Sequence, residues 1–147
     1  MVTFRIANER DLPELLVLAK EFCEIDNHIY EESRITNTFT PLFSNPQLGL
    51  IVLAAQGANL LGYAVLTWGW SIESGGREGL IDEIYVRERN AGLGSELLAE
   101  VVKVAKQNDV KMIFLETELA NERVRGFYRR HGFIQEESIW LSYPLDD

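Results

Sequence analysis

The sequence has a single cysteine, Cys23, so no disulfide can form within the chain, and we expect a reducing compartment such as the cytoplasm. Long hydrophobic runs are also missing. The longest strongly apolar stretch, residues 48–55, is far shorter than the roughly 20 residues that a membrane-spanning helix needs. The first residues, MVTFRIANERDL, carry charges early and have no apolar signal core, so nothing in them indicates export. We therefore expect a cytoplasmic protein with no membrane partner.

Basic side chains are the minority, because 14 Lys and Arg residues stand against 23 Asp and Glu residues, for a net charge of -9. This balance argues against a nucleic-acid partner, which needs a basic footprint. The charge is unevenly placed, since residues 1–32 hold eight carboxylates and three basic side chains. Residues 121–131 reverse the sign with four arginines. The two regions could hold a cationic and an anionic ligand, or they could be two solvated helix faces.

The sequence contains no Cys/His cluster with metal-ligand spacing, and we expect no metal cofactor. Cys23 lies on the apolar side of a predicted helix and has no obvious base partner. It is therefore interpreted as a structural thiol and not as a nucleophile.

Hydrophobic periodicity predicts one domain over residues 1–147. Strands are expected over residues 3–7, 48–55, 60–70, 80–86, 110–115 and 133–144. Helices are expected from Asp11, where Glu14 would complete a capping box, over residues 92–107, and from an Asn121 cap to Gly132. Residues 27–45 are ambiguous between a short helix and a loop. The predicted fold class is α/β (α+β), a mixed and mostly antiparallel central sheet flanked by helices.

The most informative segment is IDEIYVRERNAGLGSELL, residues 81–98, in which a strand runs into Gly92 and Gly94 and a helix opens at once. Backbone N–H groups at a helix N-terminus bind anions, and glycine lets a phosphate approach closely. A dinucleotide fingerprint would need three glycines, and a Walker loop would need Gly-Lys followed by Ser or Thr. Neither signature is present, and coenzyme A is a ligand that offers a pyrophosphate without either signature. A plain turn before a helix is the alternative.

A second segment, NERVRGFYRRHGF, covers residues 121–133. Asn121 and Tyr128 are seven residues apart, about two helical turns, so they share one helix face. A phenol at that position could protonate a departing thiolate. A core or rim aromatic residue is the alternative reading of Tyr128.

Together, the two segments resemble the GNAT superfamily of acyl-CoA-dependent N-acyltransferases. The family has a strand followed by the motif (Gln/Arg)-x-x-Gly-x-(Gly/Ala). Arg89, Gly92 and Gly94 match this motif. The helix with Asn and Tyr seven residues apart, followed by Gly-Phe, is matched by Asn121 and Tyr128. The predicted order of elements agrees over nearly the whole chain. The resemblance implies a GNAT-like fold and an acetyl-CoA-dependent N-acetyltransferase.

The resemblance also implies a role for each matched residue. The strand bearing Ile84, Tyr85 and Val86 would pair its backbone with pantetheine. The pyrophosphate would be wrapped by Arg89, Asn90, Ala91, Gly92, Leu93, Gly94 and Ser95. Asn121 and Val124 would contact the coenzyme, and Tyr128 would be the general acid. The chain departs from the common pattern in a short loop after Val86 and in an abbreviated terminal hairpin.

A catalytic base must come from the acceptor side, and Asp82 and Glu83 are the candidates. Because they are adjacent on a strand, they are expected to point to opposite faces. The resemblance favours Asp82, and the residues themselves leave both open. His28 and His131 are weaker candidates. The expected mechanism is direct attack of the deprotonated amine on the thioester carbonyl.

The sequence does not name the acceptor, which is expected to be a small-molecule or peptide amine. The acidic N-terminal segment favours a protonated amine, and Trp68 and Trp70 could form an aromatic wall against a cation. An acidic surface and core tryptophans are the plain alternative. A homodimer is expected by resemblance only. Two rival functions are a non-catalytic acyl-CoA-binding or sensor domain and a nucleotide-binding domain built on Gly92.

Overall fold

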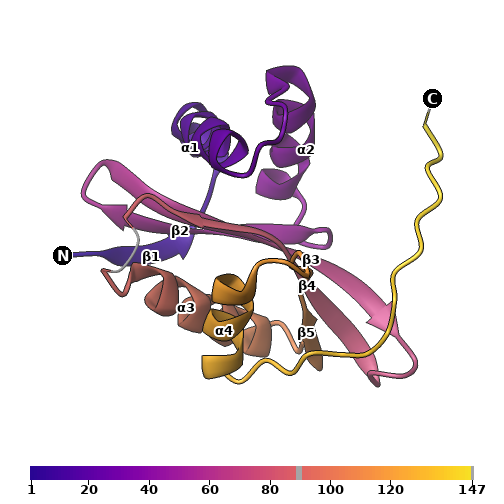
Figure 1. Cartoon of the computed structure of the whole chain (residues 1–147). Helices are drawn as coiled ribbons and strands as arrows, with labels where there is room; N and C mark the ends of the chain where they lie inside the picture. The colour runs from indigo at the N-terminus through magenta and orange to yellow at the C-terminus, as the bar shows by residue number, and fades with distance from the viewer. Residues whose placement is uncertain (89–90, 147) are drawn as a thin grey trace. The chain divides into compact units, whose positions relative to one another are not determined.

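The computed structural model describes residues 1–88 and 91–146. The chain divides into two compact units, Met1–Glu116 and Thr117–Asp147. Figure 1 shows the order of the helices and strands along the chain.

Within its described residues, the first unit forms one sheet in the order β1-β2-β3-β4-β5. The strands are β1 (Thr3–Ile6), β2 (Gly49–Gln56), β3 (Asn59–Ser71), β4 (Gly76–Val86) and β5 (Met112–Phe114). Neighbouring strands are antiparallel as far as β4, and β4 pairs with β5 in parallel. The predicted mixed, mostly antiparallel sheet is confirmed. β4 begins earlier than expected, and β5 is shorter.

Helices cover both faces of this sheet: α1 and α2 lie on one face and α3 on the other (Figure 1). They are α1 (Leu12–Ile25), α2 (Glu32–Ser44) and α3 (Leu93–Gln107), with a short 3₁₀ turn at Glu9–Asp11. The ambiguous residues 27–45 therefore contain the whole of helix α2. No helix within residues 1–88 and 91–146 combines the length and the apolarity that crossing a bilayer requires.

β2 is apolar along nearly its whole length because both of its faces are buried. Ile51 and Leu53 belong to the buried cluster beneath α1 and α2. The alternate residues Leu50 and Val52 line a hollow with Val104 of α3 on the other face. A strand buried on both faces has no polar side, so the usual alternation of polar and apolar residues disappears.

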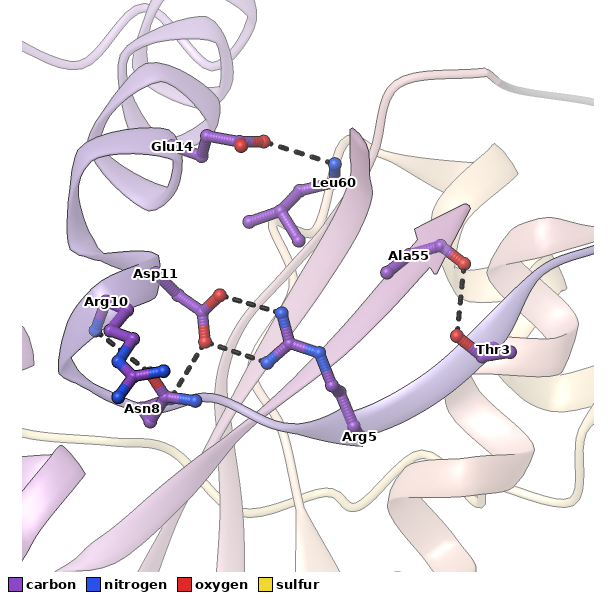
Figure 2. A network of polar contacts seen from close by, with 8 residues as sticks. All are labelled: Thr3, Arg5, Asn8, Arg10, Asp11, Glu14, Ala55 and Leu60. Atoms are coloured by element: carbon purple, nitrogen blue, oxygen red, sulfur yellow. Dashed lines mark hydrogen bonds and ion pairs between the residues drawn. The ribbon is translucent and has the colours of Figure 1, made fainter. Parts of the chain in front are cut away.

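The predicted capping box of Asp11 and Glu14 is wrong. The Asp11 side chain makes no cap hydrogen bond to α1. Its Oδ2 accepts from the Asn8 backbone N–H at 2.8 Å, which forms a capping box around the preceding 3₁₀ turn. Arg5 donates two hydrogen bonds of 2.8 Å to the same carboxylate (Figure 2). Two charge-assisted hydrogen bonds from a guanidinium are stronger than one bond from a backbone amide. The Asp11 carboxylate therefore binds Arg5 of β1 and does not cap α1.

Glu14 has a different role from the one that the capping box assigned. Its Oε2 accepts from the Leu60 backbone N–H at 3.3 Å, which connects α1 to the start of β3 (Figure 2). The two carboxylates of the expected local motif therefore both serve contacts that join separate elements.

The second unit contains α4 (Glu122–Arg130), whose ends agree with the sequence. The Asn121 Oδ1 accepts from the Val124 backbone N–H at 3.2 Å, so Asn121 is the N-cap. Gly132 has a φ of 93°, and its N–H donates to the Arg129 carbonyl at 3.1 Å. Glycine adopts this left-handed conformation without the strain of a Cβ atom, which ends the helix.

The expected last strand, residues 133–144, is not formed. The described residues 133–146 have no regular secondary structure. The segment is rich in strand-forming residues, but strands are stabilised by hydrogen bonds and side-chain pairs with a neighbour. The sheet pairings within the described chain include no partner for it. Trp140 and Leu141 consequently stay exposed, at 75% and 91%.

Candidate active site

A β-bulge marks β4 at the position of the two adjacent carboxylates. Val65 of β3 pairs with Glu83, whereas the next residue, Leu66, pairs with Ile81. Asp82 is therefore the extra residue on β4. A bulge disrupts the ladder locally and re-aims the neighbouring side chains, and bulges are common beside active sites.

Glu83 is partly buried and held by a defined donor. The hydroxyl of Tyr63, a fully buried residue of β3, donates to Glu83 Oε1 at 2.8 Å. Burial raises the pKa of the Glu83 carboxyl, and the negative charges of Asp82 and Asp26 act in the same direction. The hydrogen bond from Tyr63 and the charge of His28 oppose this rise in pKa. A carboxylate with a raised pKa can take up a proton closer to neutral pH, as a general base must.

Asp82, the other candidate base, lies in different surroundings. Its side chain is exposed to solvent at the bulge, whereas Glu83 is sheltered and bound to Tyr63. The adjacent pair expected from the sequence therefore consists of one solvated and one sheltered carboxylate.

Cys23 of α1 is partly buried near this carboxylate. Burial raises the pKa of its thiol, and the negative charges of Glu83, Asp26 and Glu24 raise it further. A raised thiol pKa disfavours the nucleophilic thiolate. This agrees with the interpretation of Cys23 as a structural residue.

Glu21 joins α1 to the end of β4, a role that the sequence did not indicate. Its carboxylate accepts from the Tyr85 hydroxyl at 3.0 Å and from Arg87 Nε and Nη2 at 3.1 and 2.9 Å. The bond from Arg87 holds the pKa of Glu21 below its ordinary value. The residues are more than 60 positions apart, so no local pattern could reveal this pairing.

The strand expected to bind pantetheine extends beyond the pairing of β4 with β5. That pairing runs from Glu78 and Met112 to Leu80 and Phe114, while β4 continues to Val86. On its other edge, β4 pairs along Ile84 to Val86 with β3. The predicted pantetheine strand therefore lies past the end of the parallel ladder.

The loop after β4 leads into α3 through Gly92. Arg89 and Asn90, two of the expected pyrophosphate contacts, lie outside the described residues. Ala91 and Gly92 are exposed. Gly92 has a φ of 78° and is the N-cap of α3, and a Cβ added there would meet nothing within 4 Å. The backbone at this turn is accessible to a ligand.

The other three expected contacts open α3 itself. Leu93, Gly94 and Ser95 form its first turn, with Leu93 buried and the other two residues partly buried. The N–H groups of a first helical turn have no acceptor within the helix, and they carry the positive end of the helix dipole. This part of the structure therefore has the chemistry of an anion site.

In the second unit, Tyr128 is 9% exposed, and burial raises its pKa to about 12. The rings of Phe127 and Phe133 lie 5.2 and 5.5 Å from the Tyr128 ring. A phenol with this pKa stays protonated at neutral pH, so it can donate a proton. His131 Nδ1 lies 2.8 Å from the Phe127 carbonyl oxygen at the end of α4.

The two tryptophans expected on the acceptor side differ in their surroundings. Trp68 Nε1 donates to the Pro46 carbonyl at 2.8 Å, and the Arg77 guanidinium lies 5.3 Å from the Trp68 ring centre. Trp70 is 79% exposed. Trp68 already faces a cation of this chain, which leaves Trp70 as the open aromatic surface.

The arrangement of a mixed sheet, a bulged strand and an open helix start agrees with the results of comparison with known proteins. The family model described as Acetyltransferase (GNAT) family matches residues 14–133. The chain belongs to this family. The sequence-based prediction of a GNAT-family acyltransferase is confirmed.

Individual relatives support the same family. The uncharacterized N-acetyltransferase YhfO of Bacillus subtilis strain 168 is 27% identical over 99 residues, which span 66% of each chain. The crystal structure of an integron cassette protein from the mobile metagenome of Cole Harbour Salt Marsh is 32% identical. It has a TM-score of 0.87, with 98% of this chain and 91% of that chain covered.

A GNAT-like fold is also shared with more distant structures. A predicted acetyltransferase from Clostridium acetobutylicum, whose crystal structure contains acetyl-CoA, is 21% identical with a TM-score of 0.81. The alignment covers 99% of this chain and 97% of that chain. The described residues of this protein contain no group of three or more His, Cys, Asp or Glu placed to hold a metal ion.

Proposed function

We propose that this GNAT-family chain transfers the acetyl group of acetyl-CoA to a primary amine by direct attack. The observation that carries the proposal is the sheltered Glu83, beside a β4 bulge and hydrogen-bonded to Tyr63 at 2.8 Å. Its raised pKa suits a group that must accept a proton from an amine. Family membership supplies the acyl donor class.

The coenzyme is proposed to bind along β4 and at the start of α3. The backbone of Ile84 to Val86 would bind the pantetheine arm, which is supported by the end of the β4–β5 ladder at Leu80. The pyrophosphate would be bound by the loop and by the first-turn amides of α3, supported by the open space at Gly92. The Clostridium acetobutylicum structure with acetyl-CoA is consistent with this donor.

The chemistry is an acetyl transfer in which the amine nitrogen loses two protons and the coenzyme sulfur gains one. Glu83 removes a proton from the amine, whose nitrogen attacks the thioester carbonyl carbon and forms a tetrahedral adduct. A β4 backbone N–H would stabilise the negative oxygen of that adduct. The C–S bond then breaks as the nitrogen of the adduct releases its second proton to solvent, which leaves the amide product. Tyr128 would donate a proton to the coenzyme thiolate and regain one from solvent. The role of Tyr128 rests on its pKa of about 12 and on the family resemblance.

We further propose that the acceptor is a cationic amine. Glu24, Asp26 and Glu31 are exposed in the acidic N-terminal segment, where they can attract a protonated amine before it loses its proton. One GNAT-like neighbour, at 14% identity, is an aminoglycoside acetyltransferase in complex with sisomicin. A cytoplasmic location stays a prediction from the sequence, and a homodimer stays an expectation from the family resemblance.

The proposal is tested by measuring thiol release from acetyl-CoA with a panel of cationic, neutral and acidic amines, and by confirming the products by mass. Cationic amines should react fastest, and added salt should reduce their kcat/KM because it screens exposed charges beyond roughly 8 Å. Equal rates for all amines without a salt effect would refute the cationic acceptor. Tight binding of acetyl-CoA without turnover of any amine would instead indicate an acyl-CoA-binding module.

A further inference from the structure

We propose that Tyr63 is a positioning residue, which holds the Glu83 carboxylate oriented and ionised for proton removal from the amine. This inference rests on the proposed function of Glu83 as the base. Tyr63 lies on β3 and is outside both segments that carry the family resemblance.

The geometry gives the Tyr63 hydroxyl a fixed position. Its ring is fully buried and lies 6.0 Å from the Phe39 ring of α2, nearly perpendicular to it, and 6.4 Å from the Tyr85 ring of β4. Three elements therefore confine one phenol. Because the phenol is packed between these rings, its 2.8 Å bond to Glu83 Oε1 also restrains the carboxylate.

The hydroxyl can act only as a donor toward Glu83. Burial raises the pKa of Tyr63 far above its ordinary value, and the negative charge of Glu83 raises it further. The phenol therefore keeps its proton at every pH at which the enzyme would work. Its bond uses one acceptor position of Oε1, and we expect Oε2 to receive the amine proton.

Several groups besides Tyr63 determine the protonation of Glu83. Asp82 adjoins it on β4, Cys23 lies on α1, and Asp26 and His28 lie in the turn after α1. His28 Nδ1 is 3.4 Å from Asp26 Oδ2. Within this set, Tyr63 is the group that donates a hydrogen bond to Glu83, and loss of that donor should favour the protonated carboxyl.

The test is the Tyr63→Phe variant, which keeps the ring and removes the hydroxyl. The acid limb of the kcat/KM profile should move upward by about one pH unit, since a hydrogen bond to a charged group has roughly this effect. The Glu83 carboxyl resonance, assigned by its loss in Glu83→Gln and followed by carbon-13 NMR, should titrate at the same raised pH. Tyr30→Phe is the matched control, because the Tyr30 hydroxyl bonds to Glu32 at 3.4 Å and not to Glu83.

The outcomes separate this inference from the proposed function. If Glu83→Gln loses activity but the Tyr63→Phe profile and titration match those of the wild type, the role of Tyr63 is refuted and the base assignment stands. If Glu83→Gln keeps the wild-type kcat and acid limb, the base assignment fails, and the role of Tyr63 fails with it.

A measurement on the wild-type protein covers the case in which Tyr63→Phe does not fold. The Tyr63 Cζ resonance should shift with the same midpoint as the Glu83 carboxyl, because protonation of the acceptor changes the bond that the hydroxyl donates. Independent behaviour of the two resonances would refute the inference.

Discussion

A comparison of Glu83→Gln with Asp82→Asn tests which of the two adjacent carboxylates is the general base. Glutamine has nearly the shape of glutamate and keeps an oxygen that accepts from Tyr63, so basicity is lost while the position is retained. Loss of a general base lowers kcat by roughly 10²–10⁴, which corresponds to about 2.7–5.4 kcal/mol of transition-state stabilisation. Asp82 is exposed at the bulge, and Asp82→Asn should change kcat by less than about twofold, within the roughly 0.5 kcal/mol of an ordinary surface change.

The same pair of variants should differ in stability, with a sign that follows from the raised pKa of Glu83. The native state binds the Glu83 proton more readily than the unfolded state, whose pKa is near the ordinary value of 4.5. The free energy of unfolding therefore decreases as the pH rises through the interval between these two values. Glu83→Gln removes that loss, so its Tm should exceed the wild-type Tm more at pH 8 than at pH 4.

The assay is steady-state thiol release at saturating acetyl-CoA, with thermal unfolding of the same samples. Retention of wild-type kcat by Glu83→Gln together with its loss in Asp82→Asn would refute the argument from burial and hydrogen bonding. A Tm difference between Glu83→Gln and the wild type that is less favourable to the variant at pH 8 than at pH 4 would refute the sign of the linkage.

The remaining predictions concern the coenzyme, the general acid and the first helix. Gly94→Val should weaken acetyl-CoA binding by at least about tenfold, or about 1.4 kcal/mol, because a branched side chain would obstruct the pyrophosphate. Unchanged affinity by calorimetry in a folded variant would contradict the phosphate site. Tyr128→Phe should bind acetyl-CoA normally but lose kcat by on the order of a hundredfold. Because the pKa of Tyr128 is about 12, this loss should be equal at pH 7 and pH 9, and full activity would indicate a packing role only. Asp11→Ala should lower the free energy of unfolding by about 1–2 kcal/mol, since it removes the bonds to Arg5 and Asn8. The native pKa of Asp11 is lowered from 3.8, so the difference from wild type should be full near neutral pH and shrink as the pH falls below about 4.

Local patterns in the sequence were sufficient to predict most elements of the fold. The hairpin of β2 and β3, helix α3 and the ends of α4 follow from periodicity and capping residues. Asn121 and Gly132 act through hydrogen bonds to residues three or four positions away, so their effect is visible in a short window. The family resemblance likewise depends on short segments whose spacing is preserved.

The last strand could not be judged in this way. Residues 133–144 have the composition of a strand, but a strand also needs a neighbour, and the sequence within one segment says nothing about whether a neighbour pairs with it. Asp11 shows the same limit for a cap, because its partner Arg5 belongs to β1.

The composition and short-range order of the sequence determined the family, the secondary structure and the two candidate bases, because each depends on residues close together in the chain. Only the tertiary structure distinguished those bases. The bulge at Asp82, the shelter of Glu83 and the bond from Tyr63 all depend on how β3, β4 and the first helices pack together. Burial and hydrogen bonding determine the protonation of a carboxylate, and both are properties of residues that meet only after folding.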